Sequence, residues 1–213
     1  MTSKRKALLR ISLVCFTLGI VGAHIITHHL SYAHEWRIRR LLHIPLKAPS
    51  EIILGNPQAP VRIFYYYSLT CRYCRLFLQK ILPELQKKYL DTGRLCLVFC
   101  EFPDDKISLD GFTLLRSLPI SAYFPVLKVL FAQQEDWIFM PAHLFTLFET
   151  FGISAQMRHS LLSKTSFSKA LLFRRFEAEE HFNLSAVPSF VVKGQVYEGA
   201  LSLLKLEEII NGR

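Results

Sequence analysis

Val61-Arg62-Ile63-Phe64-Tyr65-Tyr66-Tyr67, followed three residues later by Cys71-Arg72-Tyr73-Cys74, is the stretch that decides the fold of this chain. The first segment is rich in β-branched and aromatic residues, which is typical of a buried strand. From the second cysteine onward, apolar residues recur at the spacing of a helix with one core face, at positions 74, 77, 78, 81, 82, 85 and 89. Thr70 is the predicted N-cap of that helix. Cys71 is therefore expected at a helix N-terminus, where N–H groups and the helix dipole favour a thiolate.

A second motif lies more than a hundred residues further on, at Ala186-Val187-Pro188-Ser189-Phe190-Val191-Val192-Lys193-Gly194-Gln195-Val196-Tyr197-Glu198-Gly199. It predicts a strand, a tight Lys193-Gly194 turn and a second strand, with Pro188 at the entry of the first strand. This motif matters because a Cys-x-x-Cys pair alone also supplies half of many zinc sites.

With both motifs in hand, the chain resembles the thioredoxin superfamily, and specifically the DsbA-like thiol:disulfide oxidoreductases. Three further segments are similar to that family: the lead-in from Ile53 to Val61, Leu82-Pro83-Glu84-Leu85 within the helix, and Glu101-Phe102-Pro103 after the next strand. The resemblance covers roughly residues 50–212.

The patterning of the rest of the chain fits an α/β fold. Residues 94–100 are almost continuously apolar, which predicts a central strand covered on both faces. Helical patterns then dominate up to about residue 182, too long a stretch for a simple crossover. The resemblance implies a thioredoxin-like domain over 51–213 with a helical insertion, about 104–185, between the second and third strands of the core. The hairpin 189–197 and a closing helix from Leu203 to Asn211 complete it.

The resemblance also implies a chemistry. Cys71 is the expected attacking thiolate, and Cys74, one turn into the helix on its core face, is the expected resolving thiol. Pro188 is expected to be cis and to pack against the cysteine pair, leaving the backbone of Val187 free to bind an extended substrate by β-augmentation. No cofactor and no metal are expected.

The chain departs from the family in two respects. Arg72-Tyr73 replaces the common Pro-His between the cysteines, so that Arg72 adds a permanent positive charge beside Cys71. We predict that this dipeptide tunes the thiolate, although Arg72 could equally be a solvent-facing helix residue. The family often carries an acidic residue six positions before the first cysteine, and here that position is Tyr65, which can hydrogen-bond but is not a carboxylate.

Three of the five cysteines lie outside the pair. Cys96 and Cys100 are four residues apart on one strand, about 13 Å, which exceeds the ~7 Å that a disulfide allows. They are predicted to be buried free thiols, with a second redox role for Cys100 as the alternative. Cys15 lies in the N-terminal apolar run and is most simply an apolar filler.

The N-terminus predicts export. A basic segment precedes an uncharged apolar run, residues 11–26, so residues 1–33 are either a cleaved signal peptide or a membrane anchor. Residues 34–50 are a predicted linker. The net charge of +9 comes mostly from residues 1–50, which leaves the domain nearly neutral and argues against a nucleic-acid partner. The expected location is periplasmic or otherwise extracytoplasmic, either soluble or anchored to the inner membrane.

The sequence therefore predicts an exported thiol:disulfide oxidoreductase, preferably a dithiol oxidase, acting on cysteine-containing proteins as a monomer. A membrane or soluble redox partner would reset its cysteine pair. A reductase or isomerase of the same fold is the alternative enzyme. Val187 instead of Thr before Pro188 disfavours an isomerase. A copper- or zinc-binding module is the alternative of a different class, although extra ligands at recognisable spacing are missing from the sequence.

Overall fold

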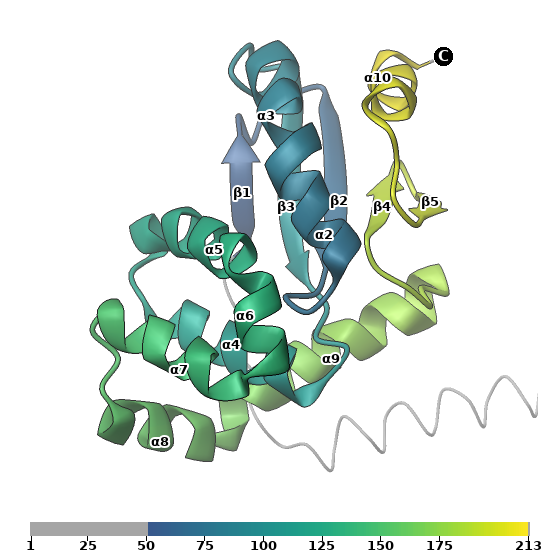
Figure 1. Cartoon of the computed structure of the whole chain (residues 1–213). Helices are drawn as coiled ribbons and strands as arrows, with labels where there is room; N and C mark the ends of the chain where they lie inside the picture. The colour runs from purple at the N-terminus through teal and green to yellow at the C-terminus, as the bar shows by residue number, and fades with distance from the viewer. Residues whose placement is uncertain (1–50, 213) are drawn as a thin grey trace, which may run out of the picture. The chain divides into compact units, whose positions relative to one another are not determined.

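The computed structural model describes residues 51–212, so the predicted export segment (1–33) and linker (34–50) lie outside the described residues. A five-stranded mixed sheet of order β1-β3-β2-β4-β5 forms the centre of this domain (Figure 1). Its strands are β1 (Ile52–Gly55), β2 (Val61–Tyr67), β3 (Leu95–Glu101), β4 (Ser189–Val192) and β5 (Gln195–Glu198). β2 and β3 run parallel, whereas β1, β4 and β5 each pair antiparallel with their neighbours. The α/β class predicted from the sequence is confirmed.

The central strand is β3, and all seven of its residues are buried. Its nearly continuous apolar sequence reflects this position. A strand that has a neighbour on each side and packed residues on both faces of the sheet exposes no side chain to solvent. The edge strand β1 was not predicted, since three of its four residues lie within the segment from Ile53 to Val61 that was interpreted as a lead-in. Gly55 ends it with a φ of +92°, and a Cβ atom there would stand 2.6 Å from the carbonyl oxygen of Leu95. Only glycine fits at this close approach of two strands.

The helix that follows the cysteine pair is not a uniform α-helix. It runs through α2 (Arg72–Leu76), the π-helical turn η1 (Phe77–Ile81), α3 (Leu82–Leu85) and a second π-helical turn, η2 (Gln86–Leu90). Pro83 explains the first widening, because it has no N–H to donate and its ring crowds the carbonyl one turn earlier. The N–H of Leu82 accordingly donates to the carbonyl oxygen of Phe77, five residues earlier, as in a π-helix. The predicted apolar face is nevertheless buried or half-buried throughout.

The helical insertion lies between β3 and β4, the second and third strands of the core, as predicted. Its helices gather at the end of the sheet where β2 and β3 finish, and the last of them leads back to the hairpin (Figure 1). They are α4 (Lys106–Ser117), η3 (Ile120–Ala122), α5 (Tyr123–Ala132), α6 (Gln134–Phe139), α7 (Pro141–Thr150), α8 (Ala155–Ser163) and α9 (Thr165–Phe182). The closing helix α10 (Leu203–Asn211) has the predicted bounds.

The two faces of the sheet carry separate cores. The larger core lies beneath α2, α3 and α10 and extends into the insertion. On the opposite face, Cys96, Val98 and Cys100 form a small buried cluster against partly buried residues such as Phe64 and Tyr66. Cys96 and Cys100 are free thiols, as predicted, and burial raises their pKa, in the case of Cys100 to about 12. Both therefore remain protonated at neutral pH.

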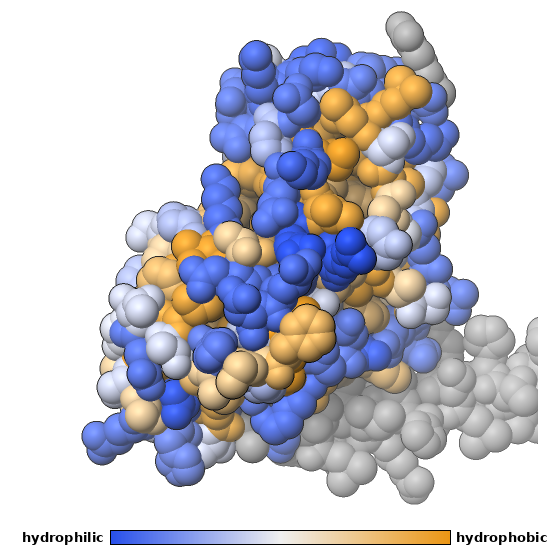
Figure 2. Space-filling model, in the orientation of Figure 1, coloured by the Kyte–Doolittle hydropathy of each residue, from blue (hydrophilic) through white to orange (hydrophobic). Residues whose placement is uncertain are grey.

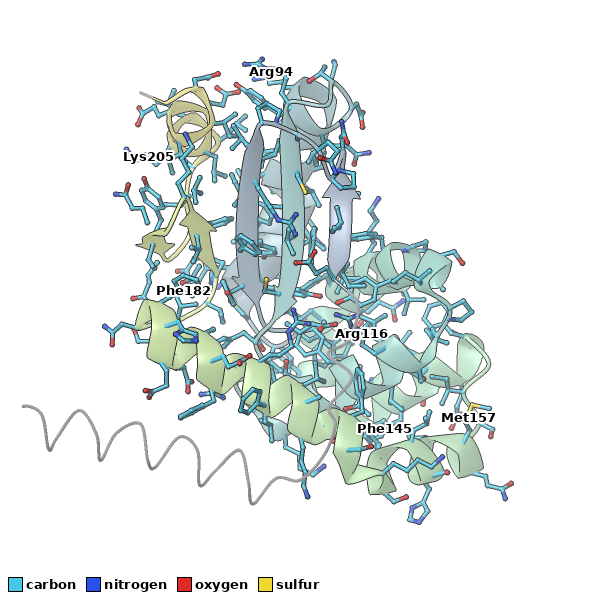
Figure 3. All side chains as sticks on the ribbon, turned by 180° about the vertical axis from the view of Figure 1, so that it is seen from behind. Arg94, Arg116, Phe145, Met157, Phe182 and Lys205 are labelled. Carbon is cyan, nitrogen blue, oxygen red and sulfur yellow. The ribbon has the colours of Figure 1, made fainter. Side chains whose placement is uncertain are left out.

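A buried polar network connects the sheet to the insertion. Glu101, the last residue of β3, receives two guanidinium N–H groups from Arg116 of α4 and the hydroxyl of Tyr123 of α5 at 2.8 Å. The hydroxyl of Tyr67, at the end of β2, lies 2.5 Å from that of Tyr123. Figure 3 shows Arg116 at this end of the strands, between the sheet and the insertion helices. Paired charges and shared hydroxyls satisfy polar groups that would be costly to bury alone.

Within residues 51–212, every helix is either too short or too polar to cross a bilayer.

This network predicts that Glu101→Gln destabilises the domain by about 3 kcal/mol, because Arg116 loses the carboxylate that compensates its buried charge. Urea unfolding followed by circular dichroism measures the change. Glu207→Gln, which removes a solvent-accessible partner of Lys88, is the control and should unfold at nearly the wild-type denaturant concentration. Equal, small effects of the two substitutions would contradict this prediction.

Candidate active site

Cys71 lies at the N-cap of α2, with extended backbone dihedrals (φ −75°, ψ 117°). Its sulfur accepts the N–H of Cys74 at 3.3 Å, so a sulfur occupies the place that a hydroxyl or carboxylate oxygen takes in other helices. The prediction that Thr70 caps this helix was wrong. The Thr70 hydroxyl donates instead to Asp104 at 2.9 Å, and it lies 3.0 Å from the hydroxyl of Ser68. Its side chain is thus engaged in the loop before the helix.

The two thiols of the pair have opposite electrostatic environments. The pKa of Cys71 is lowered, first by a hydrogen bond from the Cys74 thiol and also by the backbone N–H groups of Cys74 and Tyr73, against the opposing effects of burial and of Asp104. The pKa of Cys74 is raised well above its usual value, first because the side chain is buried and then by the adjacent Cys71. One sulfur is thus prepared to be a thiolate while the other keeps its proton.

The second motif reaches the same place from 116 residues away. The Cys71 thiol donates to the carbonyl oxygen of Val187 at 3.4 Å, so this backbone group lies beside the reactive sulfur. The Val187–Pro188 peptide bond is cis, as expected from the resemblance, and Pro188 is buried. The structure therefore brings the two segments of the candidate site together, as the sequence predicted.

Arg72 and Tyr73, the two residues between the cysteines, are both exposed, and 58% of Tyr73 is accessible to solvent. Around the start of α2, Figure 2 shows a hydrophilic surface with apolar surface on its flanks. Tyr73 contributes to the thiolate through its backbone N–H rather than its ring. The two side chains thus face solvent, while the contacts that favour the thiolate come from the helix itself.

Tyr65 takes the place beneath the pair where the family often has an acid. The side chain is fully buried, and its hydroxyl donates to the carbonyl oxygen of Cys74 at 3.4 Å. A hydrogen bond with the Cys74 thiol lowers the pKa of that thiol, although burial outweighs it. Burial also raises the pKa of Tyr65 well above its usual value, so the phenol stays neutral and acts as a hydrogen-bond donor.

Sequence reasoning missed Gln134, the first residue of α6. Its side chain is buried, with 1% exposure, and its amide nitrogen donates to the carbonyl oxygens of Leu69 at 2.7 Å and Cys71 at 3.0 Å. The next residue, Glu135, pairs with Arg75 of α2 at 2.6 Å. Residues 69–75, which we call the cysteine turn, are therefore held by two consecutive residues of the insertion. Gln134 stands within a run of four polar residues, Gln133 to Asp136, so the sequence did not show which of them is buried or which atoms it contacts.

A second group of polar residues that the sequence did not identify holds the loop before Cys71. The Ser68 hydroxyl donates to the Asp104 carboxylate and to the hydroxyl of Ser108 at 2.8 Å, and the N–H of Leu69 donates to Ser108 at 3.1 Å. The loop after β2 is thereby joined to the loop after β3 and to the start of α4. Asp104 is also the negative charge that opposes the Cys71 thiolate.

Over the described part of the chain, histidine, cysteine and acidic side chains form no group of three or more that could hold a metal ion.

Known proteins are similar to this chain in sequence and in fold. The model of a family described as thioredoxin matches residues 47–212. A Rickettsia typhi protein, provisionally named a protein-disulfide oxidoreductase, is 28% identical over 149 residues, which make up 68% of this chain and 55% of that protein. A Rickettsia conorii protein of the same provisional name is 29% identical over 149 residues, 68% of this chain and 54% of its own. The chain thus spans just over half the length of these curated relatives.

Solved structures agree in fold. Wolbachia pipientis α-DsbA1 superposes with a TM-score of 0.69 at 22% identity, covering 80% of this chain and 94% of that one. BdbD from Bacillus subtilis superposes with a TM-score of 0.63 at 21% identity, covering 78% and 95%. With the family model matching most of its length, and with a sheet, insertion and cysteine pair arranged as described, the chain belongs to the thioredoxin family and has the fold of its DsbA-like members.

Proposed function

We propose that this protein is an extracytoplasmic thiol:disulfide oxidoreductase that oxidises dithiols in protein substrates through Cys71 and Cys74. The observation that carries the proposal is the opposite shift of the two thiol pKa values at a helix N-terminus, 3.4 Å from a backbone carbonyl that a substrate strand can use. The names of the Rickettsia relatives support the same activity. The extracytoplasmic location rests on the export pattern of residues 1–33.

The reaction begins with the pair in its disulfide form. A substrate thiolate attacks the Cys71 sulfur, the Cys71–Cys74 bond breaks, and Cys74 leaves and takes up a proton, as its raised pKa favours. The second substrate thiolate then attacks the substrate sulfur of the mixed disulfide, and Cys71 leaves as a thiolate. The substrate has lost two electrons, and the cysteine pair has gained them.

The lowered pKa of Cys71 determines the preferred direction. A stabilised thiolate is a good leaving group and lowers the free energy of the reduced protein, which makes the disulfide form an oxidant. A redox partner must then reoxidise the pair. Reduction or isomerisation of disulfides is the alternative within the same site, and Val187 before Pro188 disfavours isomerisation.

Substitution of each cysteine separates the two roles. Cys71→Ser should abolish exchange, whereas Cys74→Ser should accumulate mixed disulfides with substrate through Cys71, because no resolving thiol remains. Non-reducing electrophoresis after incubation with a reduced, unfolded protein detects the adducts. Cys96→Ala, which alters a buried thiol on the other face, is the control and should exchange like the wild type. Trapping by Cys71→Ser would reverse the assignment.

Arg72 tests how much of the thiolate stabilisation comes from an exposed side chain rather than from the N–H groups at the start of α2. The wild-type pKa of Cys71 should lie well below that of a free thiol, and Arg72→Ala should raise it only slightly, because the exposed guanidinium is screened by water and salt. Thiolate absorbance against pH, at low and high salt, measures both quantities. A wild-type pKa like that of a free cysteine would contradict the preference for an oxidase.

Gln134 tests whether the insertion holds the cysteine turn. In Gln134→Leu, the buried carbonyl of Leu69 loses its amide partner, whereas that of Cys71 still accepts the N–H of Arg75 at 3.2 Å. We expect a loss of roughly 1–3 kcal/mol in unfolding free energy and faster amide exchange at residues 69–75 than in the wild type. Glu149→Gln, which changes an exposed partner of Arg158 away from the turn, is the control and should leave exchange at residues 69–75 as in the wild type. Unchanged exchange at 69–75 in a folded Gln134→Leu variant would show that α6 does not hold the turn.

A further inference from the structure

The loop from Ser185 to Pro188 connects α9 to β4 and carries the backbone of Val187 to the Cys71 sulfur. Both ends of the loop are fixed by packing. Just before this segment, Leu184 is buried in a small cluster with Phe102 and Ala178. At its end, Pro188 is buried next to the start of β4. Figure 3 shows Phe182 at the end of α9, next to the hairpin. The middle of the loop, by contrast, is exposed at Ser185 and Ala186 and needs another constraint.

That constraint comes from the last residue of β5. Glu198 pairs with Ser189 across the hairpin, and one of its carboxylate oxygens accepts the backbone N–H of Ser185 at 2.6 Å and that of Ala186 at 3.3 Å. The hydroxyl of Ser185 lies 3.3 and 3.2 Å from the two oxygens and donates to them. A single carboxylate therefore binds two successive backbone N–H groups, immediately before Val187.

Two further contacts fix the loop to the hairpin. The Ser189 hydroxyl donates to the carbonyl oxygen of Ala186 at 2.7 Å. The N–H of Gly199 donates to the carbonyl oxygen of Pro188 at 2.8 Å. The pKa of Glu198 is lowered, first by the N–H of Ser185, so the side chain is a carboxylate at neutral pH. Hydrogen bonds to a charged acceptor are stronger than those between neutral groups. Glu198 thus supplies the charge-assisted part of this arrangement.

We propose that Glu198 is a positioning residue for substrate binding: its carboxylate holds the Ser185–Ala186 backbone so that Val187 presents its main chain to a substrate strand beside Cys71. This proposal rests on the proposed exchange function and names the residue that preorganises its peptide-binding segment. Substrates that bind through their own backbone depend on the position of Val187, because strand addition requires aligned N–H and C=O groups. A small dithiol has no backbone to align and meets only the sulfurs.

The test compares a peptide with a small dithiol. Oxidised wild-type protein, Glu198→Ala and Glu198→Gln are assayed with an unstructured two-cysteine peptide and with dithiothreitol, with glutathione disulfide as the reoxidant. We expect the ratio of kcat/KM for the peptide to kcat/KM for dithiothreitol to fall roughly 5- to 10-fold in Glu198→Ala, mainly through the peptide KM. Glu198→Gln, which keeps a neutral acceptor, should show a smaller fall.

Glu208→Gln is the matched control, since it removes the charge of a carboxylate that pairs with Lys205 on α10, and its ratio should equal that of the wild type. Thermal unfolding checks that each variant is folded. An unchanged ratio in both folded Glu198 variants would overturn the proposal, and so would equal losses with peptide and dithiothreitol, which would indicate damage to the cysteine pair itself. Failure of the wild type to oxidise either dithiol would instead overturn the exchange function.

Discussion

The hydrogen bond from the backbone N–H of Cys74 to the Cys71 sulfur is the interaction on which the rest of this site depends. It makes a sulfur the N-cap of α2, so a negative charge on that sulfur lies where the helix already presents unpaired N–H groups. The same geometry places Cys74 one turn further on, under the protein surface. A single local feature therefore produces two thiols with opposite tendencies to ionise.

Everything around this turn limits its freedom. Gln134 and Glu135 hold it from the insertion, Ser68 holds it from the preceding loop, and Val187 faces it from the hairpin side. None of these contacts uses the side chain of Arg72 or Tyr73, so the position of the sulfur depends little on that exposed dipeptide. This arrangement explains how the sequence between the cysteines differs from the common Pro-His while the geometry of the helix start is retained.

The sequence was a good guide to features with a strong period or a fixed motif. The buried strand 95–101, the hairpin, the closing helix and the meeting of Cys71 with Val187 follow from apolar patterning and from the family resemblance. Local contacts were harder to predict. Thr70 has the chemistry of an N-cap, but Asp104 takes its hydroxyl, and this competition depends on a loop that is distant in sequence. Gln134 and Glu198 are ordinary polar residues until the fold shows which backbone atoms they meet.

The connectivity of the site has a consequence for the newly made chain. The helical insertion separates the two halves of the site, so the contact between Cys71 and Val187 closes a loop of 116 residues. Contacts of such long sequence separation form late, because the entropy of the intervening chain must be overcome first. Before that point Cys71 lacks the backbone of Val187 beside it, even where the start of α2 has already formed. The two halves of the candidate site therefore meet only when the hairpin has docked, near the end of folding.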